Sequence, residues 1–181
     1  MNEGEDKSMV ATPSLGEARA ESALGKGLAA LARIATVTAC VCLVGMTLVE
    51  AWQVYARYVL NNSPSWTEPV VLLLMSGAMM FGAAAGVRGE AHFGFFIAVH
   101  VAPPAVRRVL LAISRLVIFA IGAVLAFWGS VLLWDGWSIP MAGAPLPSGL
   151  MFLPIGLGGA LISLFALERL ITAAPAPSVE H

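Results

Sequence analysis

Charged residues are scarce in this sequence, and their scarcity decides its class. Lys, Arg, Asp and Glu make up 12% of its 181 residues, whereas soluble domains carry roughly 25%. Hydrophobic residues make up 59% and the mean hydropathy is +0.84, so an ordinary soluble domain is excluded and a membrane protein is indicated. The formal net charge of -1 argues against a nucleic-acid partner, because no excess of positive charge can neutralise phosphates.

Residues that hold cofactors are also few. Cys40 and Cys42 lie two positions apart in an apolar stretch, which is typical of small buried hydrophobic residues. His92 and His100 surround a predicted turn, whereas a bis-histidine haem site needs histidines that face each other within helices. No phosphate-binding glycine loop, metal-ligand cluster or nucleophile–base pair is recognisable in the sequence. It therefore predicts neither a cofactor nor an enzyme.

Long apolar runs are abundant and define the expected fold. Four of them reach the length of about 20 residues that a membrane-spanning helix needs. We therefore predict an all-α integral membrane protein, with a four-helix membrane domain at 28–171 between tails at 1–27 and 172–181, the first tail partly disordered. Residues 14–26 can form a helix at the membrane surface, and residues 93–105 a turn or a second such helix. The predicted spans are about residues 28–54, 69–87, 109–134 and 148–171.

The basic residues predict an orientation. Of the 10 Lys and Arg residues, Arg57 alone falls on one side of the predicted spans. Because cytoplasmic loops are enriched in Lys and Arg, we expect both termini to be cytoplasmic. The loops at 57–68 and 135–147 are then expected to face outside.

Small residues at four-residue spacing predict where helices pack. In lipid, small side chains on one stripe let two helix backbones approach closely. Such stripes are predicted on the second span at Ala78, Gly82 and Gly86, and on the third at Gly122, Ala126 and Ser130.

Polar and aromatic residues gather where the first two spans meet a loop. Glu50 and Arg57 share a face of the first helix, and two interpretations stay open: a polar stripe whose side chains reach water, or a contact with a partner protein. Glu68 and Pro69 suit the start of the second helix, since an acid favours the helix dipole and proline lacks an N–H that would have no partner there. Trp66 fits an outer aromatic belt.

Motifs along these spans occur in an order that resembles a known family. The motifs are Arg57-Tyr58, Asn61, Trp66-Thr67-Glu68, Phe81-Gly82-Ala83-Ala84, Arg88, His92, Pro103-Pro104 and Arg107-Arg108. The chain resembles the small membrane subunit (DctQ type) of tripartite ATP-independent periplasmic (TRAP) transporters, over about residues 31–170. It departs from that family in having Pro69 where a second acid often follows Glu68, and Phe95-Phe96 where an acid often follows the histidine.

The resemblance implies a non-enzymatic subunit of the bacterial inner membrane. In such systems a periplasmic binding protein delivers a small organic acid, and a large membrane subunit carries the substrate and sodium sites. The small subunit packs on the large one and stabilises it, so this chain is expected to hold no substrate, metal or cofactor. The candidate residues for subunit contact or docking are Glu50, Arg57, Trp66, Glu68, Arg88 and His92.

Two other functions are weighed beside this one. A self-sufficient four-helix antiporter acting as a dimer would use Glu50 as its proton-linked acid. A membrane anchor for a redox complex would carry bound haem.

Overall fold

The computed structural model describes residues 23–89 and 104–171. This part of the chain is all helical, with no β-strand, and its four long helices are long and apolar enough to cross a membrane. The prediction of an all-α protein with four candidate membrane spans is therefore confirmed. The helices are α2 (Ala23–Tyr58), α3 (Thr67–Arg88), α5 (Pro104–Asp135) and α6 (Leu153–Ile171), and a short 3-10 helix, η2 (Ser148–Phe152), precedes α6.

Some helices are longer than the apolar stretches from which they were predicted. The 36 residues of α2 correspond to a length of about 54 Å, whereas the hydrocarbon core of a bilayer is about 30 Å thick. Lys26 and Arg57 lie inside α2, beyond the predicted bounds of its span, because a polar residue ends an apolar run without ending a helix. The predicted surface segments at 14–26 and 93–105 lie largely outside the described residues.

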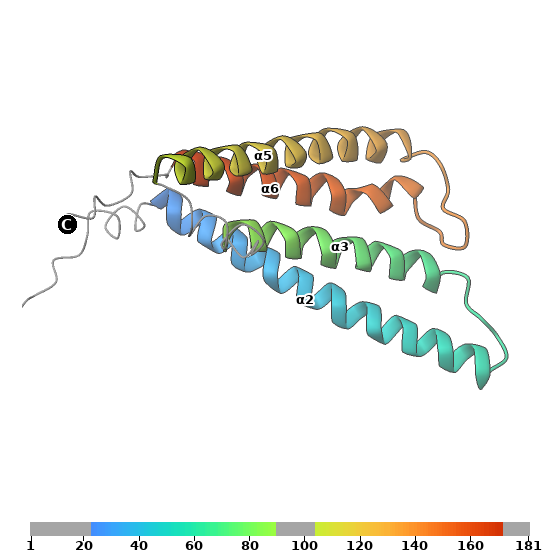
Figure 1. The fold of residues 1–181 in the computed structure, drawn as a ribbon. Helices are drawn as coiled ribbons and strands as arrows, with labels where there is room; N and C mark the ends of the chain where they lie inside the picture. The colour runs from blue at the N-terminus through green and yellow to red at the C-terminus, as the bar shows by residue number, and fades with distance from the viewer. Residues whose placement is uncertain (1–22, 90–103, 172–181) are drawn as a thin grey trace, which may run out of the picture.

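The four helices form an open row and not a closed bundle. Along the row, α2 packs against α3, α3 against α6 and α6 against α5 (Figure 1). The helices α2 and α5 are therefore the two edges, and α2 diverges from the α5/α6 pair toward one end. We call that end, with loops 59–66 and 136–147, the loop end, and the opposite end, where α2 begins and α6 finishes, the tail end.

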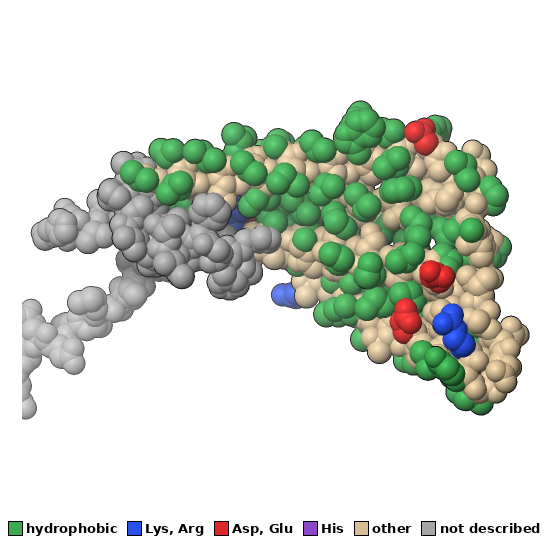
Figure 2. All heavy atoms as spheres, turned by 45° about the vertical axis from the view of Figure 1, so that its right-hand side comes forward, with side chains coloured by type: hydrophobic (Ala, Val, Ile, Leu, Met, Phe, Trp, Pro, Cys, Tyr) green, Lys and Arg blue, Asp and Glu red, His purple; other side chains and the backbone are tan. Residues whose placement is uncertain are grey.

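The buried core lies between the helices in the half of the row near the tail end. Phe165 of α6 and Ala84 of α3 are 0% exposed, and Leu28 of α2 is in the same cluster. Ile118 and Phe119 of α5 pack against that cluster. Only 6% of the most apolar stretch of the third span and 33% of that of the fourth are buried, so the helices leave most of their apolar surface for lipid or for other proteins. Figure 2 shows hydrophobic side chains along the whole visible length of the helices.

Close backbone contacts join α5 to α6. A Cβ built on Gly129 would lie 2.5 Å from the backbone nitrogen of Gly156, a distance that no side chain can occupy. The same crowding recurs seven residues before and seven residues after this contact in both segments. The last of these contacts lies just beyond α5, at Gly136, and in η2, at Gly149. The facing pairs are Gly122 with Ser163, Gly129 with Gly156, and Gly136 with Gly149.

The structure gives the neighbours or the exposure of each residue in the two predicted stripes. Gly122 and Ala126 both border Gly159 of α6, and Ser130 borders Gly156, with its hydroxyl oxygen 3.6 Å from a Cβ built there. Ser130 is nevertheless exposed, and it donates its hydroxyl to the Ala126 carbonyl at 2.7 Å. On α3, Ala78 is buried, Gly86 is partly exposed and Gly82 is exposed.

Candidate functional site

An ion pair joins α3 to α6 at the tail end. Arg88 donates from Nε to Glu168 Oε2 at 3.1 Å and from Nη2 to Oε1 at 3.2 Å. This two-pronged geometry is the strongest arrangement of a guanidinium and a carboxylate. The side chains are 24% and 16% exposed, respectively, so water screens the pair only in part.

Further hydrogen bonds extend the pair to the other two helices. Arg88 Nη2 also lies 3.4 Å from the Gly25 carbonyl of α2. Arg169 donates to the Arg88 carbonyl, and Arg115 of α5 donates to the Arg169 carbonyl at 3.1 Å. Both of these acceptors belong to last helical turns, where carbonyls lack a partner within the helix. We call these five residues the tail-end clasp, because together they connect all four helices.

The clasp includes one of the candidate residues, Arg88. Arg88, a predicted contact residue, lies in an ion pair within the chain, and its role toward another subunit stays a prediction. His92 lies outside the described residues. Glu168 was not among the candidates, although its place at the end of the fourth apolar run, on the same side as Arg88, was a usable signal.

At the loop end, the two loops are tied together. Ser65 donates its hydroxyl to the Gly143 carbonyl at 3.0 Å. Gly143 has a φ of 87°, and a Cβ there would lie 2.5 Å from the Ser65 carbonyl oxygen, so this contact requires glycine. Next to it, the fully buried Thr67 donates to the Pro64 carbonyl at 2.8 Å and fixes the start of α3.

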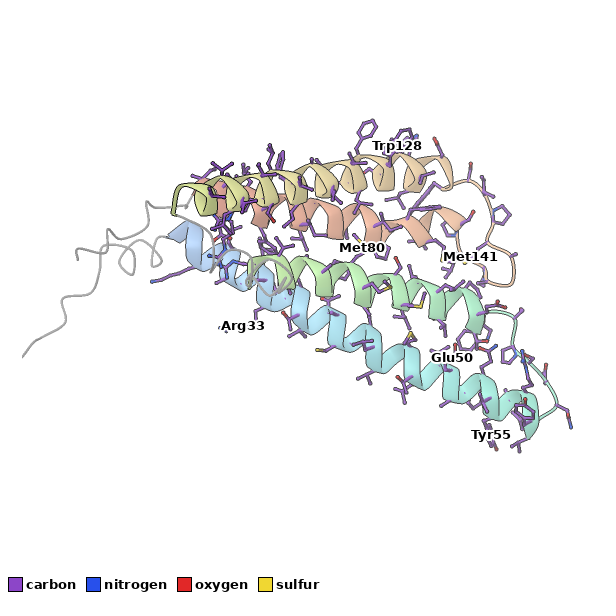
Figure 3. The ribbon with its side chains drawn as sticks, viewed as in Figure 1. Arg33, Glu50, Tyr55, Met80, Trp128 and Met141 are labelled. Carbon is purple, nitrogen blue, oxygen red and sulfur yellow. The ribbon has the colours of Figure 1, made fainter. Side chains whose placement is uncertain are left out.

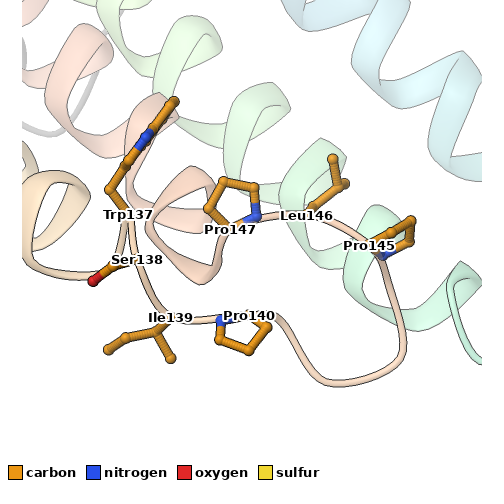
Figure 4. Close-up of a pocket in the computed structure, with 7 residues that line it drawn as sticks. All are labelled: Trp137, Ser138, Ile139, Pro140, Pro145, Leu146 and Pro147. Atoms are coloured by element: carbon orange, nitrogen blue, oxygen red, sulfur yellow. The ribbon is translucent and has the colours of Figure 1, made fainter.

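The second loop is held by its own backbone. Met141 N donates to the Leu146 carbonyl at 2.8 Å, and the Ser148 nitrogen and hydroxyl both donate to the Ile139 carbonyl at 2.8 Å. The loop encloses a shallow hollow of about 270 Å³ lined mainly by Trp137, Leu146 and three prolines (Figure 4). Because its lining is mostly apolar, the hollow suits an apolar group better than an organic acid.

The remaining candidates are exposed at or near the loop end. Arg57 lies 3.5 Å from the Ser63 hydroxyl, and Trp66 is 41% exposed immediately before α3. Glu68 is exposed in the first turn of α3. Glu50 is exposed on α2, and Figure 3 labels it nearer the loop end than Arg33.

The register of α2 and α3 gives the level of Glu50. A Cβ on Gly45 would lie 3.4 Å from the Leu74 side chain, and one on Gly77 would lie 3.0 Å from Cys42 Sγ. Since the helices are antiparallel, these contacts put Glu50 beside the first turn of α3. Glu50 and Glu68 therefore lie at the same level, where the candidate spans meet the loops.

The interior offers few groups for chemistry. Within residues 23–89 and 104–171, Thr67 is the only polar side chain that is buried, and no three His, Cys, Asp or Glu side chains are placed to hold a metal ion. The charged groups of this part of the chain lie at helix ends and on outward faces. What the described structure presents is therefore a set of surfaces for contact.

Comparison with known proteins identifies a family. A family model described as "Tripartite ATP-independent periplasmic transporters, DctQ component" matches residues 46–176. The matched stretch runs from within α2 to beyond α6 and covers most of the chain. No curated protein matches the chain.

Proposed function

The chain belongs to the DctQ component family of tripartite ATP-independent periplasmic transporters, and we propose that it is the scaffold subunit of a sodium-coupled, binding-protein-dependent transporter for small organic acids. Members of this family are transport components and not enzymes. In our proposal the chain is a partner of the large membrane subunit, which carries substrate and sodium. It packs on that subunit and stabilises it in the bilayer.

The observation that carries this proposal is the open row of helices. A transporter needs polar groups that converge on a substrate within the membrane, whereas Thr67 is the only buried polar side chain that the described helices contain. Within the described residues, an open row also leaves both of its faces and both of its edges without a further covering helix. Such a shape is consistent with a scaffold on which a larger membrane protein packs.

The charges support an orientation for this complex. Arg115 and Arg169 lie toward the tail end, and Glu50, Glu68 and Asp135 lie toward the loop end. By the preference of basic residues for the cytoplasm, the tail end and both termini are cytoplasmic and the loop end faces the periplasm. There the exposed Arg57, Trp66 and Glu68 are available to a periplasmic binding protein.

Purification of the intact complex tests the proposal. The tagged chain is extracted gently from its native membrane and the complex is weighed by mass spectrometry. We expect a one-to-one assembly with a much larger membrane protein, because the proposed role of this chain is to pack on the large subunit. A homodimer without such a partner would contradict the proposal.

A further inference from the structure

The helix α2 carries two parallel stripes of residues, and only one of them packs against another described helix. Beside these stripes α2 exposes large apolar residues such as Ile34, Val41 and Leu48. Both stripes follow the alternating spacing of three and four residues that keeps side chains on one face of a helix. The first stripe faces α3, and each of its members is buried or partly buried. It consists of Leu28, Ala32, Ala35, Ala39, Cys42, Met46, Val49, Gln53 and Ala56.

The second stripe, which we call the second seam, has the same spacing but no partner helix within residues 23–89 and 104–171. Every member is exposed, and most members carry an oxygen, nitrogen or sulfur atom. Thr36 and Thr47 donate their hydroxyls to carbonyls four residues earlier, each at 3.0 Å, so they add small side chains without unpaired hydroxyls. The second seam consists of Arg33, Thr36, Cys40, Leu43, Thr47, Glu50, Val54 and Arg57.

The opposite edge of the row has a different composition. The exposed side chains of α5 between Leu116 and Trp134 are large and apolar except for Ala120 and Ser130, and Trp128 points away from α6 (Figure 3). Lipid-facing surfaces are large and apolar, whereas small and polar side chains mark contacts between membrane helices. By this criterion α5 faces lipid and the second seam faces protein.

The charge on the second seam defines its partner. Within the described residues Glu50 forms no ion pair, although it lies on a membrane helix at the level where α3 begins. A second copy of the chain is a poor partner, because a twofold axis along the membrane normal would bring Glu50 against Glu50 and Arg57 against Arg57. A helix of a different protein, with a basic or hydrogen-bond-donating side chain at that level, satisfies Glu50.

We propose that the second seam of α2 packs against a membrane helix of the large transporter subunit, with a basic or hydrogen-bond-donating residue of that helix facing Glu50. The proposal rests on the proposed function, since it names the surface through which the two subunits meet. It also assigns α5 to the lipid side of the complex.

Photocrosslinking in the membrane of cells that make the whole transporter tests this assignment. A benzophenone amino acid replaces Leu43, in the middle of the second seam, and in a separate strain it replaces Val124 on α5 as a control. We expect the probe at Leu43 to crosslink to the large subunit and the probe at Val124 to give no such product. Crosslinks from Leu43 to lipid or to a second copy alone, or from Val124 to the large subunit, would overturn the proposal.

Matched substitutions give an independent readout. Thr47→Leu enlarges a small residue of the second seam, while Ala120→Leu enlarges a small exposed residue of α5. We expect Thr47→Leu and Glu50→Lys to lower the amount of large subunit that co-purifies about tenfold, the loss of one or two packed contacts in a membrane, and Ala120→Leu and Asp135→Lys to leave it unchanged. Equal effects on both edges would contradict the assignment.

The two proposals fail in different ways. If the wild-type chain does not co-purify with a large membrane protein, the proposed function is wrong. If it does co-purify but the crosslinks run through α5, the function stands and the assignment of the second seam is wrong.

Discussion

The five residues of the tail-end clasp connect the four helices through a small number of hydrogen bonds. Arg88 and Glu168 are 80 positions apart in the sequence, yet they form an ion pair. The surrounding arginines donate to carbonyls at the ends of α3 and α6. The clasp therefore uses backbone acceptors that any helix end provides, and its specificity lies in the pairing of Arg88 with Glu168.

Removing Arg88 should destabilise the isolated chain. In Arg88→Ala, the partly buried Glu168 carboxylate loses both of its hydrogen bonds to the guanidinium, which costs roughly 2–3 kcal/mol. Thermal unfolding of the purified chain in detergent should show a lower midpoint than for the wild type. Arg33→Ala removes an exposed arginine from α2 and should leave the midpoint unchanged.

A charge swap separates the ion pair from the other bonds of Arg88. The double variant Arg88→Glu with Glu168→Arg restores the pair, but a glutamate cannot donate to the Gly25 carbonyl. We therefore expect the unfolding midpoint of the double variant to lie between those of Arg88→Ala and the wild type. No recovery at all would mean that the pair contributes little and that the backbone contacts dominate.

The sequence made Arg88 a candidate but could not supply its partner. A basic residue at the end of an apolar run stands out by its cost in lipid. Which acid lies opposite depends on the order of the helices and on the register of α3 against α6, and neither is encoded within a short segment. Glu168 could be seen as an acid at the correct end, but its pairing required the fold.

At the scale of helices, the spacing of small residues decides how closely α5 and α6 approach. Seven residues bring a helix back to within roughly 20° of the same face, whereas four residues overshoot by about 40°. The interval of seven that relates Gly122 to Gly129 therefore keeps glycine on the contact. Ala126 and Ser130, at four-residue spacing from Gly122, still border Gly159 and Gly156 of α6.

Adding one methyl group should distinguish a contact glycine from an exposed one. In Gly129→Ala the new Cβ would meet the backbone of Gly156 at 2.5 Å, and in Gly82→Ala its nearest neighbour would be the Ala39 side chain at 4.0 Å. The first change should destabilise the chain by about 1–3 kcal/mol through overpacking. The second should be neutral or slightly stabilising, since alanine favours a helix. Thermal unfolding in detergent measures both, and an equal response would argue against the close α5/α6 contact.

Length and apolarity predicted the existence of all four helices but not their exact bounds. Pro104 begins α5 several residues before the apolar run at 109, because proline is favourable at a first helical position. Thr67 begins α3 two residues before Pro69, fixed by its bond to the Pro64 carbonyl. Both starts depend on local backbone chemistry and not on hydropathy.

At the scale of the whole molecule, the open row was not predictable from the sequence. In water, the buried face of a helix is apolar and its outer face is polar, so the pattern reveals which side packs. In lipid both faces are apolar, and exposed residues such as Val41 and Val124 resemble the buried Phe165 in chemistry. The order of α2, α3, α6 and α5 is set by close fits such as Gly158 against Met80, which only the structure reveals.

The orientation and the docking end can be tested together by chemical labelling. Ser63 is exposed in the first loop, and Gly27 is exposed near the start of α2 with no atom within 4 Å of a built Cβ. In cells with a permeabilised outer membrane, an impermeant thiol reagent should modify Ser63→Cys and not Gly27→Cys, because in the proposed orientation the loop end faces the periplasm. The wild-type chain serves as a blank, since Cys40 and Cys42 lie within a membrane span.

Addition of substrate-loaded binding protein should then slow the modification of Ser63→Cys. Arg57 contacts Ser63, and Trp66 and Glu68 follow it in the same loop and first helical turn, so a protein docked on these residues would cover the thiol. Modification of Gly27→Cys alone would invert the proposed orientation. An unchanged rate at Ser63→Cys, with uptake intact, would instead move the docking surface away from this loop while leaving the orientation in place.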